Sequence, residues 1–362
     1  MRFEGGNLFS PVGRDTVRFF PSSLVVCVFL CGGANTLMAQ QQAMPRELLL
    51  FKEVSTVVSA TGREQPLTQS PSAITVITAE EIRHSGATSL PELLRGVPGL
   101  DLFRTSASGV SIAARGLNLE DRSRIQVLID GLSVYEDVSA VLFWHQIPIP
   151  LDEIERIEIV RSPATALYGD KAFAGVVHIL TKSPEALQGT QVSGTLGDAG
   201  TGIVNLIHAG VAGNLSYKAS MGYDRTEQFP NPAVGRAHGE LGRADTRGHF
   251  QVNYTLPQGS QVALSGGIDA FDRREVLPAG PFQAVVAGGL SFLKASYAVG
   301  DFKAQLSYNR FDVDIRSESF FEDIAATVNV YQVKLQHSLA LGRTNVLTGE
   351  APIVLSPRIR RG

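Results

Sequence analysis

Apolar and polar residues alternate with a period of two over most of the chain beyond Gln188. The clearest alternation runs from Leu215 to Asp224, and similar runs occupy 250–256 and 331–341. Alternation of this kind predicts strands with one apolar face and one polar face. Each run has about the 9 to 11 residues that a tilted strand needs to cross a bilayer. The pattern alone fits a membrane-spanning β-barrel and a soluble β-sandwich equally well.

The connections between these runs favour the barrel. Eight strands are predicted, near residues 189–197, 201–211, 214–224, 246–256, 260–271, 285–298, 301–313 and 327–341. After the first hairpin, tight turns alternate with long links, the tight turns being 213–214, 257–259 and 299–301. Membrane barrels place short turns at one end and long loops at the other. A sandwich has no reason to sort its connections in this way.

Residues 71–188 mix short strands with two short helices, which is the pattern of a compact α+β domain. Strands are expected near 73–77, 99–103, 110–113, 126–129, 154–160 and 175–181. Thr78 and Glu81 have capping-box spacing at the start of the first helix, and Ser89 and Glu92 repeat that spacing before the second. Gly96 is expected to end the second helix with a left-handed cap.

The first 39 residues have the order of a secretory signal peptide. Two arginines precede an apolar run at 19–31, and short residues follow up to Ala39. The run is shorter than the about 20 apolar residues of a membrane-spanning helix. Cleavage after Ala39 would remove Cys27 and Cys31, which are the chain's 2 cysteines. A buried N-terminal helix is the alternative interpretation.

The segment 40–70 is polar and contains one β-prone run with no core pattern around it. The run consists of Lys52, Glu53, Val54, Ser55, Thr56, Val57 and Val58. Its β-branched residues favour an extended backbone. We expect an exposed strand that pairs with the sheet edge of another protein. An ordinary first strand of the following domain is the alternative.

Charge and motif content exclude several classes of function. The formal net charge is -3 and the pI is about 6.2, so the chain lacks the basic footprint of a nucleic-acid-binding protein. The 7 histidines form no HExxH motif, and neither a GxSxG elbow nor a GxGxxG turn is present. We therefore expect no enzyme, no bound metal, no cofactor and no nucleic-acid partner.

The segments between 71 and 188 resemble those of TonB-dependent outer-membrane receptors. The resemblance rests on SAITVITAEEIRHSGATSLPELLRGVPGLDL, SIAARGLN, IQVLIDGLSVY and LDEIERIEIVRSPATALYGDKAFAGVVHILTK, in that order. It implies that 52–58 is the TonB box, that 71–188 is a plug held inside a barrel, and that 40–70 lies in the periplasm. One departure is Ser162, where the family usually has glycine.

The resemblance also implies a location and partners. Similar receptors lie in the outer membrane of Gram-negative bacteria, surrounded by outer-membrane lipid. They take energy from TonB and its inner-membrane energising complex. Their cargo is a small-molecule ligand such as a ferric siderophore, another metal chelate or cobalamin. The alternative, from a different class, is an exported β-rich binding or adhesion protein that never enters the membrane.

Candidate site residues lie in the plug segments. Arg115, Arg161 and Glu158 would be enclosed charges, and an enclosed charge needs a partner. The resemblance implies pairing between the plug and the barrel, with the two arginines on acidic barrel residues. Tyr135 and the later pair Trp144 and His145 are candidate ligand contacts, because similar receptors bind ligand on outward plug loops. A packed or solvated His145 is the alternative.

The predicted fold class is an α+β plug followed by an antiparallel all-β, incomplete transmembrane β-barrel at 189–341. Barrels that hold such a plug have about 22 strands. Alternation ceases after Gly349, so we interpret 342–362 as an aberrant or truncated tail and suspect a frameshift there. On this interpretation the chain as given is expected not to transport.

Overall fold

A computed structural model divides the chain into two units, of which the second, Glu53–Gly362, is compact. The structure describes residues 56–59, 65–104, 110–114, 124–134, 144–145, 147–198, 200–226, 242–276, 283–317, 324–341, 345–355 and 360–361. The expected signal peptide and residues 52–55 lie outside these ranges, whereas every described residue belongs to the second unit. Over the described ranges, no helix is long and apolar enough to cross a membrane.

The plug domain is built on a five-stranded sheet with the order β3-β8-β9-β6-β7. Its strands are β3 (Ile74–Thr78), β6 (Ile125–Ile129), β7 (Leu132–Ser133), β8 (Ile154–Val160) and β9 (Gly175–Thr181). β6 and β9 run parallel, and the other neighbours run antiparallel. A separate hairpin joins β4 (Leu100–Arg104) to β5 (Val110–Ala114). The predicted α+β class is confirmed.

Branched aliphatic side chains fill the core of the plug. Ile157 of β8 and Val177 and Ile179 of β9 are fully buried in one hydrophobic cluster. The same cluster includes residues of α3 (Leu90–Leu94) and of the loop before β8. β-branched residues suit these strands because their side chains pack well on a pleated surface. Charged side chains on β8 and β9 are therefore carried by strands that a packed core holds in place.

Short helices connect the strands of the plug. They are η1 (Leu67–Gln69), α2 (Ala79–His84), α3, η2 (Leu151–Glu153), α4 (Thr165–Tyr168), η3 (Asp170–Ala172) and η4 (Pro184–Leu187). The capping box at Thr78 and Glu81 is present as predicted. The second predicted box is absent, because the Ser89 side chain makes no cap hydrogen bond and Glu92 accepts from Thr88 instead. α3 ends at Leu94, and Gly96 does not adopt a positive φ.

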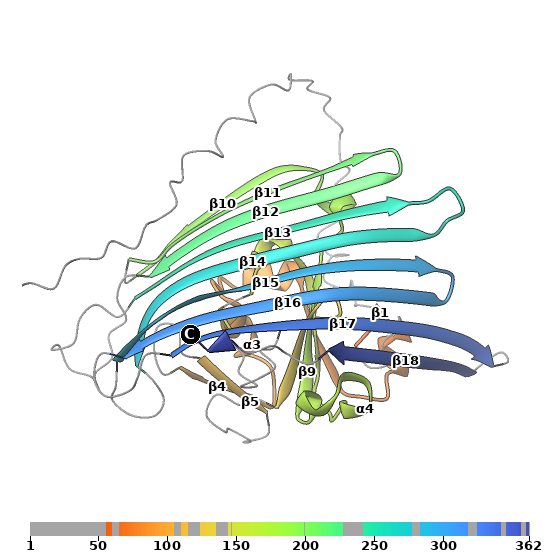
Figure 1. Ribbon diagram of the computed structural model, residues 1–362, viewed down its shortest axis with the longest axis horizontal. Helices are drawn as coiled ribbons and strands as arrows, with labels where there is room; N and C mark the ends of the chain where they lie inside the picture. Colours follow the sequence, from red (N-terminus) through yellow and green to blue (C-terminus); the bar gives the residue numbers. More distant parts are fainter. Residues whose placement is uncertain are drawn as a thin grey trace, which may run out of the picture. The chain divides into compact units, whose positions relative to one another are not determined.

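Beyond the plug, one antiparallel sheet runs in sequence order from β10 to β18 (Figure 1). Its strands are β10 (Gly189–Leu196), β11 (Gly202–Ala212), β12 (Leu215–Thr226), β13 (Arg243–Thr255), β14 (Gln261–Val276), β15 (Gln283–Val299), β16 (Phe302–Ser317), β17 (Ile324–Leu341) and β18 (Asn345–Leu355). The first eight match the predicted strands. The three predicted tight turns carry Gly213, Gly259 and Gly300 at positive φ, which glycine adopts without steric cost.

The segment after Leu341 forms a strand that extends past the point where the side-chain alternation ceases. β18 continues through Gly349 to Leu355 and pairs antiparallel with β17. A second short strand, β19 (Arg360–Arg361), also pairs with β17. Loss of side-chain alternation did not prevent pairing, because the ladder is formed by backbone groups.

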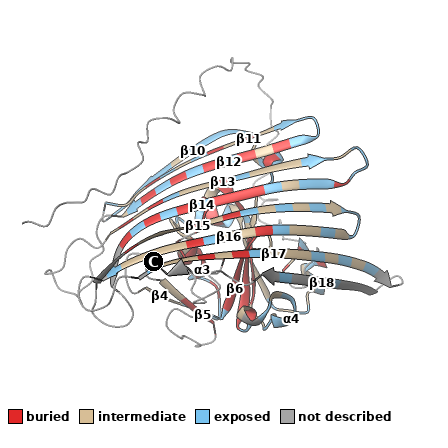
Figure 2. Cartoon of the chain, in the orientation of Figure 1, coloured by how far each residue is buried: buried red, intermediate tan, exposed pale blue. Residues whose placement is uncertain are grey.

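In β12 the large sheet buries mainly polar side chains and exposes mainly apolar ones, whereas later strands also bury apolar side chains such as Phe271 and Phe311 (Figure 2). In β12, Lys218 and Asp224 are 2% and 3% exposed, whereas Met221 and Tyr223 are 56% and 46% exposed. A soluble sandwich does the reverse, since it packs its apolar faces together. The buried polar face contacts the plug, so the two parts meet through charged and hydrogen-bonding side chains.

Candidate functional site

The predicted coupling run enters the described structure at Thr56. Thr56 and Val57 form β1, which pairs antiparallel with β2 (Gln65–Pro66). Val57 is fully buried. Thr56 is exposed, and pairing of this run with the sheet edge of another protein remains a prediction. Residues 52–55 lie outside the described ranges.

Glu158 of β8 holds the residues that follow this run. Its Oε2 accepts hydrogen bonds from the backbone N–H of Val58 at 2.9 Å and of Ser59 at 2.8 Å. Its Oε1 accepts from Arg156 Nε at 2.9 Å. Burial by itself raises the pKa of Glu158, but the hydrogen bonds from Ser59, Val58 and Arg156 outweigh it and lower the pKa. A plug–barrel role was expected for Glu158, whereas these partners lie in the N-terminal segment and in the plug.

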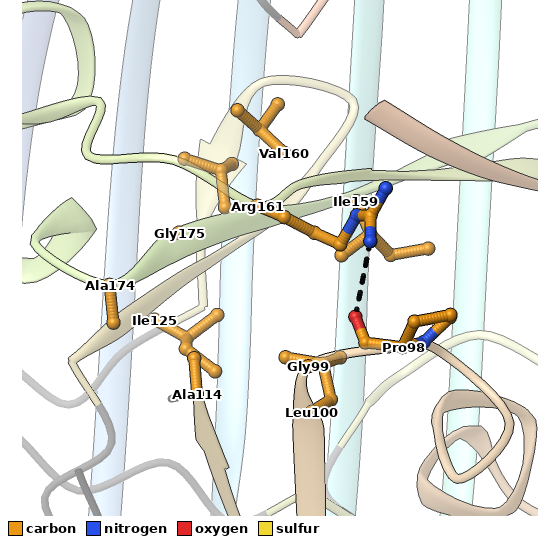
Figure 3. A pocket seen from close by; sticks show the side chains of 11 residues that line it. Pro98, Gly99, Leu100, Ala114, Ile125, Ile159, Val160, Arg161, Ala174 and Gly175 are labelled. Carbon is orange, nitrogen blue, oxygen red and sulfur yellow. Dashed lines mark hydrogen bonds between the residues drawn. The ribbon is translucent and has the colours of Figure 1, made fainter. Parts of the chain in front are cut away.

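Arg161 lines a pocket of about 150 Å³ inside the plug. Its Nη1 donates to the carbonyl oxygen of Pro98 at 3.4 Å (Figure 3). The other walls come mainly from apolar residues of β6, β8 and β9 and from the segment at Pro98–Leu100. Pairing of Arg161 with an acidic barrel residue remains a prediction. Arg115, the other predicted arginine, lies outside the described ranges.

Glu153 makes the strongest charged contact between the plug and the large sheet. Glu153 is the last residue of the short helix η2 and is fully buried. Its Oε2 accepts a hydrogen bond from Ser220 Oγ at 2.6 Å. Its Oε1 lies 2.6 Å from His249 Nδ1 and 3.0 Å from Lys218 Nζ. Burial alone would raise the pKa of Glu153, but His249, Lys218 and Ser220 together lower it to about 2.

Further barrel side chains reach the backbone of the plug. Lys218 Nζ donates to Lys182 O at 2.7 Å, and Lys294 Nζ donates to Asp130 O at 3.0 Å. On β16, Asn309 Nδ2 donates to Ser133 O at 3.1 Å. Sequence reasoning missed Glu153 and these contacts. Their only signal was a lysine or asparagine among the inward positions of an alternating strand.

The predicted ligand-contact residues separate in the structure. Trp144 is 2% exposed and belongs to the hydrophobic core of the plug. His145 is 6% exposed, and its Nδ1 contacts Arg243 Nη1 of β13. Burial first, and then the charges of Arg243 and nearby arginines, hold the pKa of His145 well below its usual value. Tyr135 lies outside the described ranges, and ligand contact by any of the three remains a prediction.

Buried charges of both signs continue from His145 along β12 to β14. Arg243 Nη2 donates to both carboxylate oxygens of Asp224, each at 2.8 Å. Arg273 Nη2 donates to Asp245 Oδ1 at 3.0 Å. Opposite charges at this depth offset one another's desolvation. Among the described residues, no group of three or more histidine, cysteine or acidic side chains is arranged to hold a metal ion.

The profile of one family, the TonB-dependent Receptor Plug Domain, matches residues 66–176, which include β3, β6, β7 and β8 and the start of β9. Over these residues the chain has the plug domain of TonB-dependent receptors. The family is one of transporters and receptors and not of enzymes. The match therefore identifies the domain that contains the five-stranded sheet and its buried charges.

Curated relatives that are similar to this chain include two vitamin B12 transporters. The chain is 32% identical over 204 residues to the transporter BtuB of Vibrio vulnificus (strain CMCP6), a match that covers 54% of this chain and 33% of that protein. It is 33% identical over 158 residues to BtuB of Vibrio cholerae, strain O395, covering 43% and 24% respectively. The chain thus spans about a third or less of these relatives.

Solved receptor structures share the fold. The FrpB iron transporter of Neisseria meningitidis superposes with a TM-score of 0.64 at 14% identity, covering 80% of this chain and 48% of that one. A mutant of the ferric enterobactin receptor PfeA of Pseudomonas aeruginosa gives 0.59 at 19% identity, covering 79% and 49%. At these identities the likeness concerns the fold alone.

Proposed function

We propose that the chain supplies the plug and several barrel strands of an outer-membrane receptor that imports a scarce nutrient with energy delivered through TonB. The observation that carries the proposal is the inverted sheet, in which apolar side chains such as Met221 and Ile268 are 56% and 60% exposed. Outward apolar residues that alternate with inward polar ones are the pattern of strands that face lipid. A soluble adhesion protein would pay a solvation cost for this face.

The contact between plug and sheet supports a plugged barrel. Lys218 and His249 point inward from neighbouring strands and meet a plug carboxylate at Glu153. Polar side chains on the inner wall are typical of barrels whose lumen is filled by water or by a plug. The plug is therefore positioned to block the lumen until it is displaced.

A cobalamin or a ferric siderophore is the proposed class of cargo. The named relatives transport vitamin B12, and the structural neighbours include iron transporters and enterobactin receptors. The residues proposed to contact cargo are Tyr135, Trp144 and His145. The energy-coupling segment is proposed to begin at Lys52 and to pair with TonB as an added strand.

Fractionation of a Gram-negative host that expresses the full chain tests this proposal. The chain is expected in the outer-membrane fraction, resistant to extraction by high salt because apolar contact with lipid holds it. Recovery in the soluble periplasmic fraction would contradict the proposal. Retention of labelled cyanocobalamin or ferric enterobactin by these membranes then identifies the cargo class, with membranes of the host alone as the control.

A further inference from the structure

Ser59 is fully buried although it directly follows the proposed coupling segment. A buried serine needs partners for its hydroxyl and for its backbone groups. Its N–H donates to Glu158 Oε2 at 2.8 Å, and its hydroxyl donates to the same oxygen at 2.6 Å. Its carbonyl oxygen accepts from the Tyr168 hydroxyl at 3.0 Å. Plug side chains therefore bind both the N–H and the carbonyl oxygen of Ser59.

His178 also contacts Ser59, and the hydrogen bonds of its ring define its tautomer. The backbone N–H of Gly131 donates to Nε2 at 3.0 Å, so this nitrogen bears the lone pair. The ring proton of the neutral imidazole is then on Nδ1, which lies 2.9 Å from Ser59 Oγ. Ser59 can accept this proton's hydrogen bond while its own hydroxyl donates to Glu158. Burial lowers the pKa of His178 to about 4, against the opposing charges of Glu158 and Asp130, and keeps the ring neutral at pH 7.

Glu158 and His178, which bind Ser59, lie on interior strands of the plug sheet. Glu158 and His178 are direct partners across β8 and β9. Each of these two strands has a neighbour on both sides, β3 beside β8 and β6 beside β9. Arg156 Nε lies 2.9 Å from Glu158 Oε1 and balances its charge. A force on Ser59 therefore reaches interior strands and not an edge.

We propose that Glu158, His178 and Tyr168 form a clasp on Ser59 that sets the C-terminal boundary of the segment open to TonB. Val58 is held by the same carboxylate, and Thr56 and Val57 are already paired with β2. An added strand needs free backbone groups. β2 occupies only one edge of β1, but Val57 is fully buried and the N–H of Val58 is bound to Glu158. Pairing therefore ends before Val57 while the clasp is closed, and Glu158 and His178 act as positioning residues. This inference rests on the proposed function for the identity of the partner.

Hydrogen exchange in the full chain, without any partner, tests the clasp itself. In Glu158→Gln and in Ser59→Ala, the amides of residues 56–59 are expected to exchange about tenfold faster or more, which is the effect of losing a hydrogen bond to a charged group. Amides of β8 and β9 should keep their protection. The control is Glu92→Gln, because Glu92 also accepts from the N–H and the hydroxyl of a single residue, Thr88. Unchanged exchange at 56–59, or an equal loss across the plug sheet, would overturn the clasp.

Cysteine crosslinking to the C-terminal domain of TonB tests the boundary. Single cysteines at Glu53 and Val54 are expected to crosslink in the otherwise unchanged chain, whereas cysteines at Val57 and Val58 should crosslink only when Glu158→Gln is also present. Equal crosslinking at all four positions without that substitution refutes the boundary. Failure at Glu53 and Val54 instead refutes the proposed coupling role, and the exchange measurement still decides on the clasp.

Discussion

Two carboxylates of the same plug segment serve different contacts at the residue scale. Glu153 precedes β8 and faces Lys218 and His249 of the large sheet, whereas Glu158 lies in β8 and faces Ser59. Both residues stand in the run LDEIERIEIV, where their acidity is visible but their partners are not. The partners come from distant parts of the chain. Sequence reasoning identified Glu158 as an enclosed charge but missed Glu153, and it could not identify the partners of either residue.

Glu153→Ala should destabilise the seating of the plug. The substitution leaves Lys218 and His249 buried without their carboxylate, and breaking a buried ion pair costs about 3 kcal/mol or more. The midpoint of urea unfolding, measured on the full chain in detergent micelles, checks this. Glu155→Ala is the control, since the Glu155 side chain is 51% exposed and changes at such sites stay within about 0.5 kcal/mol. Equal effects of the two substitutions would contradict the anchor.

The free energy of unfolding should decrease as the pH is lowered, because His178 titrates differently in the folded and unfolded chain. Its pKa is lowered from 6.5 to about 4 in the folded plug, first by burial. Between these values the unfolded chain binds more protons than the folded one, so the free energy of unfolding decreases as the pH falls from 6.5 towards 4. His178→Asn removes the titrating ring but keeps an amide near the position of Nδ1. Urea unfolding at pH 7.5 and 5 should show a smaller loss in this variant, and an equal loss would refute the assignment.

Strand positions were predictable at the element scale, but helix caps were only partly so. Period-two alternation located β10 to β17 because every second side chain meets the same environment. The first predicted capping box forms, since Thr78 and Glu81 bond reciprocally. The second does not form, because the Glu92 carboxylate accepts from Thr88. Spacing alone cannot rank two nearby hydroxyl residues that compete for one acceptor. The same competition left the Ser89 hydroxyl without a hydrogen-bond partner.

Thr78→Ala and Ser89→Ala should therefore differ. Thr78 Oγ1 accepts from the N–H of Glu81 at 3.2 Å, and loss of such a cap costs about 1 kcal/mol. Ser89 caps α3 without a side-chain bond, so its replacement should leave the free energy of unfolding almost unchanged. Urea unfolding of both variants beside the unchanged chain makes the comparison. A larger loss for Ser89→Ala would show that the second cap forms after all.

Orientation of the large sheet emerges only at the scale of the whole molecule. The alternation alone left open which face is buried, whereas the sorted connections favoured a membrane barrel with its polar face inward. The structure answers this because the plug presents Glu153 and backbone carbonyls to the sheet, and only Lys218, Lys294 and similar residues can satisfy them. The apolar face is consequently turned outward. That arrangement separates a membrane barrel from a sandwich more sharply than any single motif.

Quenching of a fluorophore by brominated phospholipid tests this orientation most directly. Single cysteines at Met221 and Phe250, which are 56% and 37% exposed on the outer face, and at Gln251 on the inner face would each carry a bimane group. The full chain, with Cys27 and Cys31 replaced by serine, is reconstituted into vesicles containing the brominated lipid. The account predicts strong quenching at Met221 and Phe250 and little at Gln251. Absence of quenching at all three positions, or quenching that ignores the alternation, would contradict it.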